Sequence, residues 1–128
     1  MNEYDKMAKD FAAKVGARLT ILDQDYKVME NWGDNTPRCV FRCRLSRKGQ
    51  SYTFEFGQSI AAGGKRPTMY DVLACLQKWD VGTFPDFCEE FGYPYGPTAR
   101  KIYDVVVREY KDVLRLFGDV MDELRDIS

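Results

Sequence analysis

Histidine is missing from this chain of 128 residues. Its absence excludes Ser–His and Cys–His catalysis, zinc sites with imidazole ligands, and imidazole acid–base chemistry. There is also no CxxC pair, so a metal site would need cysteines alone or carboxylates. A cluster of carboxylates is the catalytic arrangement left open, although most acidic residues fall at solvent positions of expected helices. We therefore expect no enzyme activity and no cofactor.

Long apolar runs are also missing. No run approaches the ~20 residues that a helix needs to cross a bilayer. Residues 1–15 are charged and helical in pattern, without the basic start and apolar stretch of a secretory signal. We expect a cytoplasmic protein that makes no membrane contact.

The four cysteines are Cys39, Cys43, Cys75 and Cys88. An even number leaves a disulfide framework conceivable. Cys39 and Cys43, however, share one face of an expected strand, where four residues span about 13 Å, too far for a disulfide. Buried free thiols that pack as small hydrophobic side chains are the favoured interpretation.

Apolar residues are plentiful, and their spacing predicts an α+β fold. They make up 45% of a chain whose length suits one domain, so we expect residues 1–128 to form a single domain. They recur every three or four positions in residues 3–15 and 102–127, and alternate with a period of two in residues 38–56. We predict an N-terminal helix, a small antiparallel sheet of three or four strands, and C-terminal helices packed on one face.

The β region is predicted as two parts. Residues 19–28 are expected to be extended, with a turn at Asp23–Asp25. After a loop at residues 31–37, a hairpin turns at residues 47–50 and places Cys39, Phe41, Cys43 and Leu45 on one apolar face.

Local signals predict where the helices begin and end. Thr68 and Thr83 each precede an aspartate by three positions, as in a capping box, and the first of these helices should bury Trp79. Thr98 is the expected cap of the last helix. Its apolar stripe keeps phase across Gly118, which predicts a continuous or gently kinked helix. The stripe suits either the core or a seam with a second copy, so monomer and homodimer both stay open.

Charge is divided along the chain. Residues 1–66 carry twelve Lys/Arg and eight Asp/Glu, net +4, and residues 67–128 carry seven and twelve, net −5. In the acidic half, rows of carboxylates are able to imitate a phosphate backbone. Basic residues are interleaved with them, however, which is typical of a solvated, ion-paired helix.

The basic excess lies in the hairpin and in the loop that follows it. The candidate partner-binding residues are Arg38, Arg42, Arg44, Arg47, Lys48, Lys65 and Arg66. Arg42 and Arg44 share one strand face, and arginine is well suited to phosphate groups and protein interfaces. The alternative is a solvated sheet face that Glu55 partly neutralises from the neighbouring strand.

Three segments resemble a group of small proteins encoded by bacteriophages and prophages. They are FGQSIA at 56–61, PTMYDVLACLQKWDVGTFPDFCEEFGY at 67–93 and RLFGDVMDELRDI at 115–127. The resemblance implies a phage setting and assigns no catalytic residue. Small phage accessory proteins include many inhibitors of host defence, among them anti-CRISPR proteins, which are commonly compact, cofactor-free and non-enzymatic.

Together these features predict a non-enzymatic inhibitor that binds and blocks a host defence nuclease. Its partner would be a host defence protein such as a CRISPR effector, in the cytoplasm of the bacterial host cell. The alternative is a nucleic-acid-binding phage accessory protein that uses the basic hairpin.

Overall fold

The computed structural model describes residues 2–28, 36–78 and 82–127, and it confirms the α+β fold. Most of the predicted loop at 31–37 and the predicted burial of Trp79 lie outside these ranges. The elements are α1 (Glu3–Val15), β1 (Arg18–Val28), β2 (Pro37–Arg47), β3 (Gln50–Gln58), the 3-10 turn η2 (Ile60–Ala62), α2 (Met69–Lys78), α3 (Phe84–Phe91), α4 (Pro97–Arg115), the 3-10 turn η3 (Gly118–Val120) and α5 (Met121–Arg125). None of the described helices is long and apolar enough to cross a membrane.

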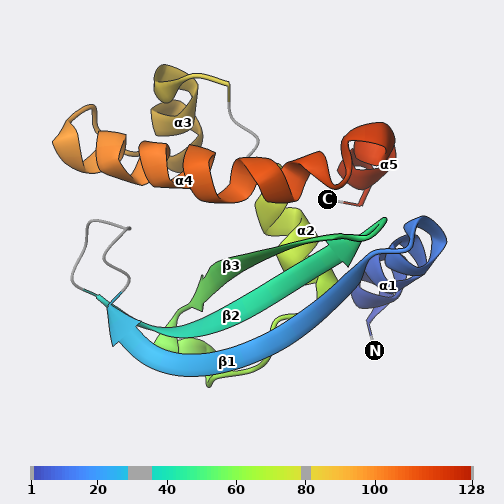
Figure 1. Cartoon of the computed structure of the whole chain (residues 1–128). Coiled ribbons are helices and arrows are strands. Elements are labelled where there is room, and N and C mark those ends of the chain that lie inside the picture. Colours follow the sequence, from blue (N-terminus) through green and yellow to red (C-terminus); the bar gives the residue numbers. More distant parts are fainter. Residues whose placement is uncertain (1, 29–35, 79–81, 128) are drawn as a thin grey trace.

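The sheet has three antiparallel strands in the order β1-β2-β3 (Figure 1). Lys48 and Gly49 join β2 to β3 with φ angles of 51° and 77°. Positive φ at both positions is the geometry of a tight hairpin turn that matches the twist of its strands. The predicted hairpin is therefore confirmed.

β1 is one continuous strand, so the predicted turn at Asp23–Asp25 is wrong. Its pairing with β2 continues on both sides of a β-bulge at Leu22, between the pairs Ile21–Cys43 and Asp23–Arg42. A bulge adds one residue without ending the ladder. Pairing with β2 therefore keeps this polar segment extended.

Helices cover one face of the sheet. In Figure 1, α2 lies behind the sheet and α4 runs past β3. Phe41, Cys43 and Leu45 of β2 are completely buried on this covered side. The cysteines are free thiols, and burial raises the pKa of Cys43 to about 12, so this thiol packs as a neutral side chain. Tyr110 of α4 anchors the helix by donating a 2.9 Å hydrogen bond to the Glu55 carbonyl.

The helix boundaries match the sequence signals, with one exception. Thr68 and Asp71 cap each other's backbone N–H groups at 3.2 and 2.8 Å, and Thr83 caps α3. Thr98 does not cap α4, because that helix begins at Pro97 with Gly96 as its N-cap. Proline suits the first helical position, where its missing N–H has no helical partner anyway.

The prediction of a continuous or gently kinked last helix across Gly118 is wrong. It breaks after Arg115, and η3 and α5 follow. Phe117, Leu124 and Ile127 are nevertheless buried, so the apolar stripe packs into the core of this chain rather than presenting a seam. The break also frees the Leu116 carbonyl from helical pairing, and an arginine uses that carbonyl as described below.

Candidate functional site

The face of the sheet opposite the covered side carries most of the charged strand residues, and we call it the open face. Alternation along β2 directs Arg42 and Arg44 to this side, as predicted, and both are exposed. The register adds residues from both neighbours: Arg18, Thr20, Asp23, Asp25 and Lys27 from β1, and Ser51, Thr53 and Glu55 from β3.

Arg18, Thr20, Arg44 and Ser46 form what we call the basic corner. The pairs Arg18–Ser46 and Thr20–Arg44 are adjacent in the ladder, so the two arginines are diagonal neighbours with Cβ atoms about 7 Å apart. They line one hollow together with Lys48, and no carboxylate of the described residues lines it. Neither Arg18 nor Arg44 forms an ion pair within the described ranges.

Arg42 has a different environment although it lies only two residues from Arg44. Its neighbours across the ladder are Asp23 on β1 and Glu55 on β3, whereas those of Arg44 are Thr20 and Thr53. Two carboxylates therefore lie beside Arg42, although Glu55 also forms an ion pair with Lys27 at 2.8 Å, and none lies beside Arg44. The open face is thus divided into an uncompensated basic corner and a half of mixed charge.

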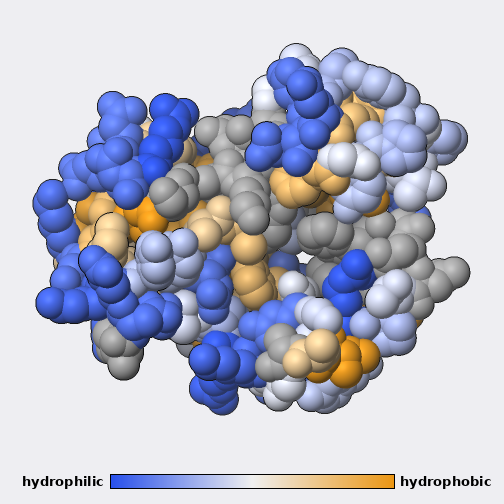
Figure 2. All heavy atoms as spheres, turned by 180° about the vertical axis from the view of Figure 1, so that it is seen from behind, coloured by the Kyte–Doolittle hydropathy of each residue, from blue (hydrophilic) through white to orange (hydrophobic). Residues whose placement is uncertain are grey.

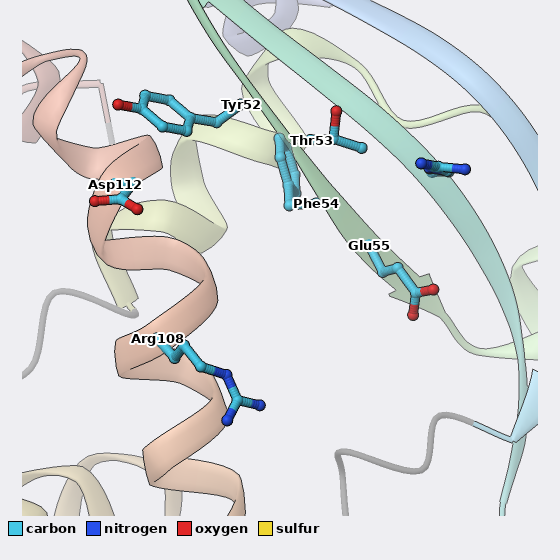
Figure 3. A pocket seen from close by; sticks show the side chains of 7 residues that line it. Tyr52, Thr53, Phe54, Glu55, Arg108 and Asp112 are labelled. Atoms are coloured by element: carbon cyan, nitrogen blue, oxygen red, sulfur yellow. The ribbon is translucent and has the colours of Figure 1, made fainter.

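A cleft lies beside the mixed half, between β3 and α4 (Figure 3). Arg108 and Asp112 project into it from α4, while Arg42 and Glu55 approach from the sheet. Two guanidinium groups and two carboxylates leave this cleft without net charge. It therefore favours neither anions nor cations.

Three candidates from the sequence lie away from the basic corner. Arg38 is half-buried at the far end of the open face, opposite Lys27. Lys65 and Arg66 line a separate hollow with the first residues of α1 and α2, where Asp5 and Asp71 also lie. The loop after the hairpin does not bring its two basic residues to Arg44.

Arg47 is buried, with 5% of its surface exposed, although it also lines the hollow of the basic corner. Its Nε donates to the carbonyl of Val15 at 2.8 Å, and its Nη1 donates to that of Leu116 at 2.7 Å. The guanidinium also forms a two-pronged ion pair with Asp119. The period of two explains this placement, because odd-numbered residues of β2 point to the covered side.

Asp119 is held by two cations. Lys48 donates to it at 2.9 Å in addition to the contacts from Arg47. The hydrogen bond from Arg47, and then the one from Lys48, keeps the pKa of the Asp119 carboxyl well below its usual range. Lys48 is exposed and lies at the rim of the basic corner. Its ammonium group is paired with Asp119.

The acidic residues of the C-terminal region are largely paired. Asp104, Asp112 and Asp122 each contact an arginine one turn away, and Glu123 contacts Lys14 of α1 at 2.8 Å. This pairing favours a solvated helix surface over imitation of a phosphate backbone. No cluster of three or more metal-ligating side chains occurs among the described residues.

Arg18 is the site residue that the sequence did not reveal. It lies far from the hairpin in the chain, and only the pairing of β1 with β2 places it beside Arg44. Searches against family models, curated proteins and solved structures find no match, so the geometry alone carries the assignment of this site.

Replacing Arg47 should destabilise the fold. In Arg47→Met, the carbonyls of Val15 and Leu116 lose their donor, which should cost about 2–4 kcal/mol of unfolding free energy. Arg44→Met on the same strand removes an exposed guanidinium and should change stability by less than about 0.5 kcal/mol. Urea unfolding of both variants measures the difference, and equal losses would show that Arg47 has no special structural role.

Asp119 should make stability fall in acid. Its pKa is lowered in the folded state, so its contribution is complete above the unfolded value of 3.8 and is lost as pH falls through the lower folded value. The stability gap between the native chain and Asp119→Asn should therefore shrink as pH falls below about 4. Urea titrations across acidic pH measure the gap, with Asp104→Asn as a surface control. A gap that does not vary with pH would contradict the coupling.

Proposed function

We propose that this chain is a non-enzymatic binding protein that holds the phosphate backbone of nucleic acid at the basic corner. The supporting observation is the juxtaposition of Arg18 and Arg44 without a carboxylate neighbour. Guanidinium groups bind phosphate oxygens through paired, charge-assisted hydrogen bonds. The hydroxyls of Thr20 and Ser46 lie between them as further donors.

The sequence suggested that the whole basic hairpin binds nucleic acid, whereas this proposal limits the binding site to the basic corner. A corner with two free arginines neutralises few phosphates, so binding should be weak and strongly dependent on salt. In the C-terminal helices, Asp104, Asp112, Asp119, Asp122 and Glu123 already have basic partners, which reduces the repulsion that this region adds.

Two neighbouring arginines provide a matched test. Arg44→Gln and Arg42→Gln remove the same charge from the same strand face, but only Arg44 lacks acidic neighbours. Arg44→Gln should weaken binding to a labelled oligonucleotide and reduce the slope of log affinity against log salt by about 0.9. Arg42→Gln should have a smaller effect. Fluorescence anisotropy over a salt series provides both quantities.

Charge reversal elsewhere controls for nonspecific electrostatics. Lys6→Glu and Lys9→Glu alter exposed residues of α1, and this double variant should retain more affinity than Arg18→Glu with Arg44→Glu. Equal losses in the two double variants, or equal effects of Arg42→Gln and Arg44→Gln, would refute the assignment to the basic corner.

A second proposal is that the chain inhibits a host defence nuclease, such as a CRISPR effector, in the bacterial cytoplasm. It is supported by the resemblance to phage accessory proteins and by exposed apolar side chains. Tyr26 and Val28 on the edge strand β1 are 59% and 37% exposed, and Ile60 in η2 is 51% exposed. Figure 2 shows an apolar patch at the end of the molecule where η2 lies. Exposed apolar patches commonly mark protein interfaces.

Capture of tagged protein from lysates that contain CRISPR effectors should separate the two proposals. An effector that stays bound after nuclease treatment identifies a protein partner, and Tyr26→Ser should then weaken capture more than Arg44→Gln. Capture that nuclease abolishes supports nucleic acid as the ligand. Failure to capture any effector, together with no protection of phage or plasmid, would reject the inhibitor proposal.

A further inference from the structure

Aromatic rings are absent from the open face within the described residues. Phe41, Tyr52, Phe54 and Phe56 all belong to the set that alternates toward the covered side. Tyr26 is paired with Cys39, which is completely buried, so it also belongs to that set. In Figure 3, Tyr52 points toward α4 and away from the exposed side of β2.

This distribution bears on which form of nucleic acid the face accepts. Proteins that hold single strands commonly stack unpaired bases on aromatic side chains, and the described residues of the open face include no such ring. In a duplex the bases stack on one another, and the outer surface presents regular rows of phosphates. From this contrast, and resting on the proposed function, we infer that the ligand of the basic corner is double-stranded nucleic acid.

The side chains of the corner also indicate how the duplex is held. Thr20 and Ser46 are short hydroxyl donors, and phosphate oxygens accept from such groups without regard to sequence. No asparagine, glutamine or carboxylate lines the hollow among the described residues. Those groups provide most recognition of adenine and cytosine edges. We therefore expect contacts mainly with the backbone, and any base preference should be limited to guanine, whose edge arginine reads.

Arg18 and Arg44 are spaced for this role. The Cβ separation of about 7 Å leaves each guanidinium free to take its own phosphate oxygen, or both to share one phosphate. Their strands belong to one sheet, so the pair is presented on a rigid surface rather than on a mobile loop. A rigid pair suits the regular backbone of a duplex better than the variable backbone of a single strand.

The test compares a DNA duplex with each of its two component strands by fluorescence anisotropy at one low salt concentration. The duplex should bind at least about tenfold more tightly. A surface without stacking rings binds through phosphate charge alone, and a duplex presents that charge more densely than a single strand does. Duplexes of unrelated sequence should agree within about twofold. Arg18→Gln should lower duplex affinity as much as Arg44→Gln does.

The outcomes separate this inference from the function on which it rests. Single strands that bind as tightly as the duplex would overturn the inference and leave nucleic-acid binding in place. Strong variation among duplex sequences would overturn backbone readout alone. Absence of binding to both forms would overturn the proposed function together with the inference.

Discussion

The hydrogen bonds of one buried guanidinium hold together parts of the chain that are remote in sequence. Arg47 at the end of β2 reaches the last carbonyl of α1, the carbonyl of Leu116 just beyond α4, and the carboxylate of Asp119. The contact with Val15 holds the α1–β1 junction against the end of β2. Three residues later, Arg18 enters the ladder opposite Ser46. The pairing of β1 with β2 sets the place of Arg18 beside Arg44, and the contact of Arg47 with Val15 supports the junction from which β1 begins.

Three arginines close together on one strand consequently have three different roles. Arg47 holds the fold together, Arg44 lies among hydroxyl groups, and Arg42 lies between two carboxylates. Alternation separates Arg47 from the other two, since successive side chains take opposite faces of a strand. The neighbouring strands then separate Arg42 from Arg44. Net charge or local charge density does not distinguish these environments, because both treat the cluster as one unit.

The ion pair between Lys48 and Asp119 connects the proposed binding surface with the contacts that stabilise the fold. The hairpin turn presents Lys48 at the rim of the basic corner, and Asp119 draws it toward the C-terminal helices. The same carboxylate completes the contacts of Arg47. Asp119 thereby lowers the positive charge available at the rim while it stabilises the junction between the sheet and the end of α4. Arg18 and Arg44, which Asp119 does not contact, remain free to bind a ligand.

Periodicity and local capping signals by themselves determined the fold class, the hairpin, its apolar face and most helix starts, because these depend on residues within a few positions of each other. They were misleading at Asp23–Asp25 and Gly118, where pairing with β2 and packing against the core override local preference. The placement of Arg18 beside Arg44, and the burial of Arg47, were decided only by the tertiary structure. Strand register and the burial of one sheet face bring together residues that the sequence holds apart.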